Sequence, residues 1–226
     1  MATASRRQHR DVKVLHRVPY AMYAQLVEDE ANRHVRMSYH NGTLEIVSPI
    51  YLAHERPSAR LRLIVTTVAD ALGLAYEGCD SSTFKKAGDG PFLGVGKEPD
   101  QSFYIPNVAR LPRELELNLE AGDPPPDLWI EVDNRVSSAG RLPVYATLGV
   151  PEVWRYRVKS RKFQMLGLTD GQYREIERSL SLPVLTPSLV LEALSLGGGL
   201  REVESDWVRM LRDWARRLVE TRADRK

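Results

Sequence analysis

An alternating stretch of acidic and aliphatic residues constrains the fold of this 226-residue chain more than any other segment. Three prolines at positions 124–126 force an extended backbone into it. In a β-strand, alternate side chains face the same side. The even-numbered side chains are aliphatic, namely Leu128, Ile130 and Val132, whereas the odd-numbered ones are Asp127, Trp129, Glu131 and Asp133. Residues 127–133 therefore predict a strand with one buried aliphatic face and one face that carries three carboxylates.

A further acid, Asp100, opens another predicted strand, residues 100–105, directly after Pro99. If the two strands pair, Asp100 and Glu131 can converge on one cation. Mg²⁺ and Mn²⁺ prefer carboxylate oxygens and usually keep several waters. Such a metal lowers the pKa of bound water and neutralises charge on a phosphate, which is the chemistry of phosphodiester cleavage. The alternative is that these acids face solvent or pair with the arginines of the chain.

The remaining elements predict an α/β protein with a mixed central sheet flanked by helices. Asn41-Gly42 between two strand-like runs is a strong hairpin signal, so we expect an N-terminal hairpin of residues 34–40 and 43–47. Apolar periodicity and end signals predict helices over residues 22–29, 54–72, 138–148, 187–194 and 202–220. Further strands are expected over residues 74–77, 82–86, 152–158, 162–168 and 172–177. Residues 87–96 are glycine-rich but lack the Gly-Lys-Ser/Thr of a nucleotide-binding loop, so we expect an ordinary loop there.

Composition fits a single domain. The chain is 42% hydrophobic and 27% charged with a net charge of +2, which is typical of globular proteins and argues neither for nor against nucleic acid. We expect a flexible basic tail at residues 1–11 and one domain over residues 12–196. Residues 197–226 are expected to form a glycine linker and an amphipathic C-terminal helix that packs on this domain. A homodimer interface is the alternative for that helix.

Three further properties limit the location and partners. Cys79 is the single cysteine, so an internal disulfide and a cysteine metal cluster are excluded and a reducing, cytoplasmic location is expected. No apolar run reaches the length of a membrane span, so we expect no membrane partner. Basic residues are spread along the sequence, so it assigns no contact with a nucleic-acid groove.

Three segments resemble the PD-(D/E)XK nucleases. Glu98-Pro99-Asp100 resembles the first acidic strand of these enzymes, and residues 126–133 resemble the second. Residues 142–154, Leu-Pro-Val-Tyr-Ala-Thr-Leu-Gly-Val-Pro-Glu-Val-Trp, are similar to a signature of one branch, the Uma-two family of restriction-endonuclease-like proteins. The resemblance covers most of the chain and includes residues 42–49 and 81–85.

The resemblance implies a restriction-endonuclease-like fold and a Mg²⁺- or Mn²⁺-dependent nuclease that acts on DNA, with RNA not excluded. It implies that Asp100 and Glu131 bind the metal and that Asp133 assists. Glu55, on the long predicted helix, matches an extra acid that many such nucleases place there. The alternative for Glu55 is an acid at a helix N-terminus that interacts favourably with the helix dipole.

The lysine of the nuclease motif is missing from its usual place. It is expected two residues after Glu131, where this chain has Asp133. In the Uma-two family the basic residue is on the following helix, and Arg141 occupies that position here. Arginine can clamp a phosphate but cannot readily lose its proton, so it is a poor general base. The possible replacements are Lys85, Lys86 and Lys97, although each is expected to be solvated.

The sequence thus leaves two functions open. The first is a DNA endonuclease, weak or inactive because of Arg141, with Asp100, Glu131, Arg141 and Glu55 as its catalytic residues. The second is a non-catalytic nucleic-acid-binding or regulatory module that keeps the fold.

Overall fold

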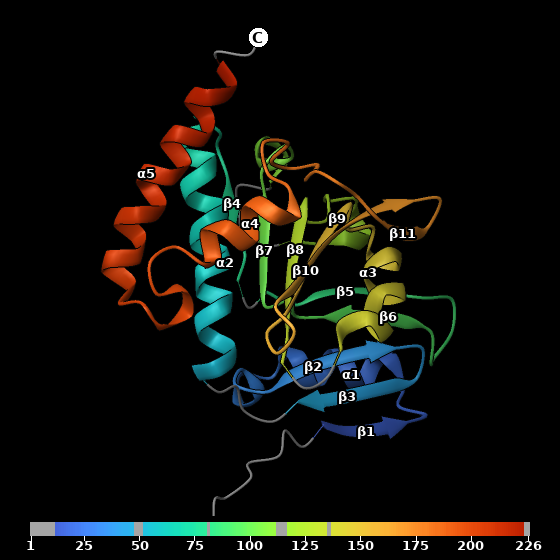
Figure 1. Ribbon diagram of the computed structural model, residues 1–226. Coiled ribbons are helices and arrows are strands. Elements are labelled where there is room, and N and C mark those ends of the chain that lie inside the picture. The colour runs from blue at the N-terminus through green and yellow to red at the C-terminus, as the bar shows by residue number, and fades with distance from the viewer. Residues whose placement is uncertain (1–11, 48–51, 81, 112–116, 135–136, 224–226) are drawn as a thin grey trace, which may run out of the picture.

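The computed structural model of the protein describes residues 12–47, 52–80, 82–111, 117–134 and 137–223. The predicted basic tail at residues 1–11 lies outside them. The described residues form two β-sheets and five α-helices, which confirms the predicted α/β class (Figure 1). The N-terminal part of the chain, where a hairpin was predicted, builds a second sheet of its own.

The N-terminal sheet has five strands whose neighbours are all antiparallel. In spatial order they are β1 (Val12–His16), β3 (Thr43–Val47), β2 (Arg36–His40), β6 (Gly94–Lys97) and β5 (Phe84–Ala87). The predicted hairpin is confirmed as β2 and β3. Its turn residues, Asn41 and Gly42, have φ angles of 43° and 84°, as a two-residue type I′ turn requires.

Helix α1 (Tyr20–Glu28) covers one face of this sheet. Tyr23 of α1 stacks on Tyr39 with 4.9 Å between the ring centroids. A Cβ atom on Gly96 would lie 2.1 Å from the hydroxyl oxygen of Tyr23, so this close packing requires glycine. The loop prediction for residues 87–96 is therefore wrong at its end, where residues 94–96 belong to β6. Strand β1 was not predicted either.

The central sheet has six strands and is mixed, as predicted. In spatial order they are β11 (Gln172–Glu175), β10 (Lys162–Thr169), β9 (Glu152–Arg157), β8 (Leu128–Asp133), β7 (Gln101–Tyr104) and β4 (Glu77–Gly78). Strands β8 and β9 are the parallel pair, and the other neighbours are antiparallel. The crossover between β8 and β9 consists of the 3₁₀ helix η4 (Ser138–Arg141) and α3 (Leu142–Leu148), which ends at Gly149 with a φ of 81°.

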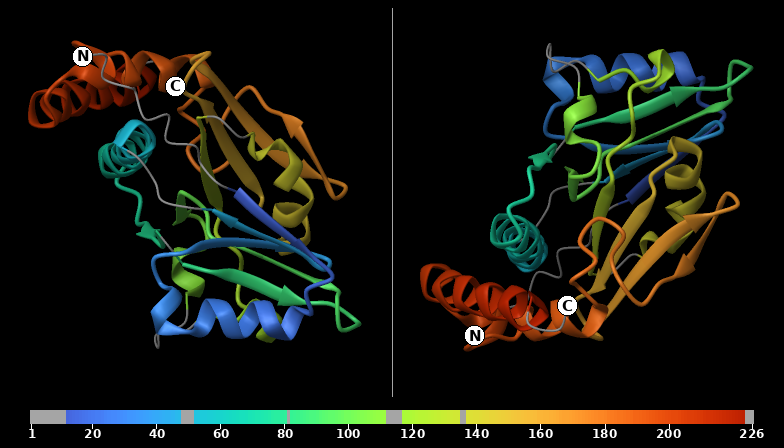
Figure 2. Two further views of the ribbon diagram at one scale, coloured as in Figure 1. Left: turned by 90° about the horizontal axis from the view of Figure 1, so that it is seen from below. Right: turned by 90° about the horizontal axis from the view of Figure 1, so that it is seen from above.

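Both faces of the central sheet are covered, so every residue of β8 is buried. The aliphatic face packs under α2 (Leu52–Ala71), α4 (Pro187–Leu194) and α5 (Glu204–Ala223). On the other face, Trp129 packs against Tyr145 of α3 and Phe84 of β5, with ring centroids 4.9 Å and 5.4 Å away. The N-terminal sheet and the central sheet thus form adjoining layers, with α1 outermost on one side and α2 with α5 on the other (Figure 2). Short 3₁₀ helices connect these elements: η1 (Glu30–Asn32), η2 (Val108–Arg110), η3 (Leu119–Ala121) and η5 (Gly199–Arg201).

The apolar face of α5 packs against the rest of the chain. Trp207 and Trp214 are buried, and the Trp207 indole N–H donates to the carbonyl oxygen of Ala193 at 3.1 Å. The guanidinium of Arg60, on α2, lies 4.1 Å from the centroid of the Trp207 ring. This contact, with the shared core cluster, fixes α5 against α2. Across the part of the chain that the structure describes, no helix has the length and apolar character needed to cross a membrane.

Candidate active site

The two predicted acidic segments meet where β8 ends and β7 begins, at one end of the strands of the central sheet. Strand β7 pairs antiparallel with β8, with Gln101 opposite Ile130, so Asp100 is placed beside Glu131 at the next step of the ladder. The Asp100 Oδ2 atom accepts a hydrogen bond from the Val132 amide at 2.8 Å. Both carboxylates are buried, with exposed fractions of 7% for Asp100 and 4% for Glu131. The structure therefore brings together the acid pair that the sequence placed on neighbouring strands.

Two cations from the N-terminal sheet face this acid pair. In that sheet Ser38 lies opposite Lys97, and Arg36 is two residues from Ser38, so both basic side chains project from the same face. The Arg36 guanidinium forms an ion pair with Asp100 Oδ1. The Lys97 ammonium nitrogen lies 3.5 Å from Glu131 Oε1. Each acid of the pair thus has a basic partner on the N-terminal sheet.

The expectation that Lys97 is solvated is wrong. This residue is only 7% exposed, because β6 presents it to the interior between the two sheets. Sequence reasoning missed it because the flanking glycines suggested a loop. The available signal was Val95 and Lys97 alternating with Gly96, which is the period of a strand whose Lys97 faces the same side as the buried Val95.

Glu131 is in an unusual electrostatic environment. Burial raises its pKa, while Lys97 lowers it and Asp100 raises it again. Its buried Oε1 atom has no hydrogen-bond partner among the described residues. Burial and the neighbouring Glu131 also raise the pKa of Tyr145 well above its usual value, so this phenol stays protonated. For Glu131 Oε1, the ion pair with Lys97 is the contact here. A buried acceptor without a hydrogen bond is costly, so Glu131 Oε1 is an atom that a ligand could satisfy.

Asp133, the third acid of β8, has other partners. Its Oδ2 atom pairs with the Arg155 guanidinium at 2.9 Å, and its Oδ1 atom accepts from the Ser138 amide at 2.8 Å. Arg155 also donates to the hydroxyl groups of Ser137 and Ser138, both at 2.8 Å. This buried network ties the end of β8 to the start of η4.

Arg141 and Glu55 differ in their relation to the acid pair. Arg141 donates through Nε and Nη2 to Glu45 Oε2, at 3.0 Å and 2.8 Å. Burial alone would lower the pKa of Arg141, but Tyr145, Glu131 and Glu45 raise it by more, so Arg141 lies within the electrostatic reach of Glu131. Glu55 is in the first turn of α2 and is exposed.

The donor set of the acid pair fits a hard divalent cation. Within the described ranges, no three His, Cys, Asp or Glu side chains are grouped so that they could hold a metal ion. Mg²⁺ does not need such a cage, since it is commonly bound by one or two carboxylates together with waters and substrate phosphates. Asp100 and Glu131 supply two carboxylates, and Glu131 Oε1 accepts no hydrogen bond among the described residues.

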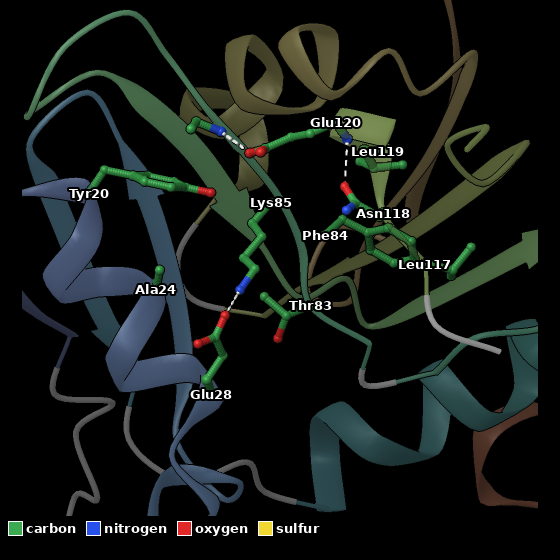
Figure 3. Close-up of a pocket in the computed structure, with 11 residues that line it drawn as sticks. Tyr20, Ala24, Glu28, Thr83, Phe84, Lys85, Leu117, Asn118, Leu119 and Glu120 are labelled. Atoms are coloured by element: carbon green, nitrogen blue, oxygen red, sulfur yellow. Dashed lines mark hydrogen bonds and ion pairs between the residues drawn. The ribbon is translucent and has the colours of Figure 1, made fainter. Parts of the chain in front are cut away.

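A separate pocket of about 460 Å³ lies between α1, β5 and η3 (Figure 3). Lys85 projects into it and pairs with Glu28, and Glu120 accepts from the Ala87 amide at 2.7 Å. Burial, Glu120 and Glu28 raise the pKa of Tyr20, at its rim, to about 12. Lys85 is paired with Gly96, which packs against α1, so this pocket is on the face of the N-terminal sheet opposite Lys97.

Comparisons with known proteins identify the family of this chain. Residues 20–200 match the family model Uma2, described as "Putative restriction endonuclease". The chain belongs to the Uma2 family. This Uma2 protein is also similar to a crystal structure described as a putative nuclease belonging to DUF820 from Anabaena variabilis ATCC 29413. That similarity has 16% sequence identity, a TM-score of 0.49, and coverage of 88% of this chain and 99% of the other. A comparison with curated proteins gives no match.

Proposed function

We propose that this Uma2 protein is a Mg²⁺- or Mn²⁺-dependent DNA endonuclease, with Asp100 and Glu131 as its metal-binding acids and Lys97 as its basic group. The observation that carries the proposal is Glu131 Oε1, which is buried, has no hydrogen-bond partner among the described residues and lies 3.5 Å from the Lys97 ammonium. An acid pair facing a buried cation is the set of charges that phosphodiester hydrolysis uses.

Asp100 and Glu131 would hold the metal. When bound, this metal would lower the pKa of an attacking water and neutralise charge on the phosphate. Asp100 is already oriented by the Val132 amide and Arg36, so its carboxylate is fixed before any ligand binds. Such preorganisation is what catalytic carboxylates require.

Lys97 takes the place of the missing motif lysine in this proposal. Its ammonium group sits beside Glu131, although it reaches the site from β6 rather than from β8. There it can stabilise negative charge on a bound phosphate oxygen. The Arg141 guanidinium is held by Glu45, so we assign it the positioning of α3 against β3 rather than proton transfer. We assign Asp133 the positioning of η4 through Arg155.

One observation favours a second function, a non-catalytic DNA-binding module. Three acids each form an ion pair without any metal: Asp100 with Arg36, Glu131 with Lys97, and Glu45 with Arg141. A protein that has lost its catalytic activity could keep these ion pairs as contacts that join the two sheets.

Plasmid nicking in the presence of Mn²⁺ or Mg²⁺ tests the first function. We expect nicking by the wild type and its loss in Asp100→Asn and Glu131→Gln, with circular dichroism showing that the variants fold. Matched controls are Asp89→Asn and Glu220→Gln, since both acids are exposed and lie outside the cluster. Nicking that survives both changes in the acid pair would refute the assignment. DNA binding without nicking in any metal would support the module.

A further inference from the structure

The turn between β9 and β10 gathers basic side chains that form no ion pair with an acid among the described residues. Residues 155–162 read Arg-Tyr-Arg-Val-Lys-Ser-Arg-Lys, with five cations and no acid. Four of these cations are exposed: Arg157, Lys159, Arg161 and Lys162. The ion pairs among the described residues include Arg155 but none of these four. These four residues form a local cluster of basic side chains, which we call the basic turn.

The basic turn lies at the same end of the strands of the central sheet as the acid pair. Parallel pairing puts Glu131 beside Arg155 and Asp133 beside Arg157, and the Val158 amide donates to the Asp133 carbonyl oxygen at 3.0 Å. Strand β7 begins at this end of the sheet, directly after Asp100. Figure 1 shows the turn between β9 and β10 next to the end of β8.

The basic turn also faces the same side as the acid pair. Arg157 is two residues beyond Arg155 on β9 and is opposite Lys162 on β10, so both cations belong to the face that carries Glu131. One strand spacing and two residues of rise separate the Cα positions of Glu131 and Arg157, which is about 8 Å. The long side chains of Arg157 and Lys162 could therefore reach phosphates next to one held at the acid pair.

We propose that the basic turn binds the phosphate backbone of duplex DNA and positions it over Asp100 and Glu131. The inference rests on the proposed function, since DNA is the substrate of that reaction. Exposed lysine and arginine side chains bind phosphates by displacing condensed counterions, which makes binding strongly salt-dependent. Such contacts fix the register of the protein on the duplex without reading its sequence.

Binding of a short fluorescent duplex, measured by anisotropy in EDTA so that no cleavage occurs, tests this proposal. The test variant carries Arg157→Gln, Lys159→Gln and Lys162→Gln, and keeps Arg161 because its φ of 50° marks a constrained turn residue. The control variant carries the same charge change on an exposed face of α5, at Arg212, Arg216 and Arg217. Thermal unfolding verifies that both variants fold.

The expected result is a change in salt dependence that is confined to the test variant. Losing three phosphate contacts should make the slope of log K against log salt shallower by about 2.7. Between about 50 and 200 mM salt the wild type should then lose about 40-fold more affinity than the test variant. The control variant should keep the wild-type slope.

Each outcome supports or overturns DNA binding by the basic turn, whether or not the protein cleaves DNA. Equal slopes for the test variant and the wild type would overturn the basic turn as the binding surface, and nicking by the wild type would still support the proposed function. Absence of duplex binding by the wild type at low salt would overturn it as well. A shallower slope in the test variant alone supports it, even if the wild type never nicks DNA and the proposed function fails.

Discussion

Replacing Lys97 by methionine gives a quantitative test of the buried charge pair. The change keeps the length of the side chain but removes the ammonium group that lies 3.5 Å from Glu131 Oε1. At this distance and an effective dielectric constant of about 20, the two charges attract by about 5 kcal/mol. Breaking a buried pair by removing one partner costs about 3–5 kcal/mol. We therefore expect a loss of this size in the free energy of unfolding at about pH 8.

The loss in the free energy of unfolding should be smaller at lower pH, because Glu131 can then take up a proton and become neutral. Burial already raises the pKa of Glu131, and Lys97 lowers it, so removing Lys97 raises this pKa further. A carboxyl with a raised pKa in the folded state stabilises the protein below the pKa of the unfolded state. That stability is lost as the pH rises through the folded-state pKa. Protonation costs about 1.4 kcal/mol per pH unit above about 4.3, so at about pH 5 the loss is at most about 1 kcal/mol.

Urea unfolding followed by tryptophan fluorescence at the two pH values measures this difference. Lys85→Met is the matched control, because Lys85 belongs to the neighbouring strand and its partner Glu28 is 64% exposed. A surface pair of this kind contributes about 0–1 kcal/mol, with little change over this pH range. Equal losses for Lys97→Met at both pH values would refute the charge argument, since a packing defect does not depend on the protonation of Glu131.

Four further changes test other parts of the account. Arg155→Met should reduce the free energy of unfolding by about 3–5 kcal/mol at neutral pH, because it leaves Asp133 buried without its cation, and urea unfolding measures the loss. Gly42→Ala should cost about 1–2 kcal/mol in thermal unfolding, since its φ of 84° is left-handed. Arg141→Lys should not increase plasmid nicking, and a tenfold gain, about 1.4 kcal/mol of transition-state stabilisation, would place the basic group at that residue instead. Glu55→Gln should leave nicking unchanged and cost at most about 1 kcal/mol of stability, as expected for an exposed acid at a helix N-terminus.

The elements with strong local signals were predictable from the sequence. The alternation in residues 127–133 gives β8 and its two faces, and Asn41-Gly42 gives the β2–β3 hairpin. The convergence of Asp100 and Glu131 was expected on condition that their strands pair, and the antiparallel pairing of β7 and β8 meets that condition. These features depend on periodicity and turn chemistry, which a single sequence carries.

The basic half of the site was not predictable in the same way. Arg36 and Lys97 reach the acids from a different sheet, so their role depends on how two layers pack rather than on any local pattern. The glycines around Lys97 suggested a loop, whereas Gly96 is needed because Tyr23 packs directly on it. Strand β1 was missed for another reason: four of its five residues are exposed, so its burial does not alternate.

In the proposed function, Asp100 and Glu131 form a divalent-cation site that faces Lys97. Crystals soaked in Mn²⁺ and measured at a wavelength with strong manganese anomalous scattering test it most directly. We expect an anomalous peak within coordination distance of both carboxylates, with Glu131 Oε1 among the ligands. A map in which Mn²⁺ binds elsewhere, or leaves the Asp100–Arg36 and Glu131–Lys97 pairs intact and unliganded at saturating metal, would contradict it.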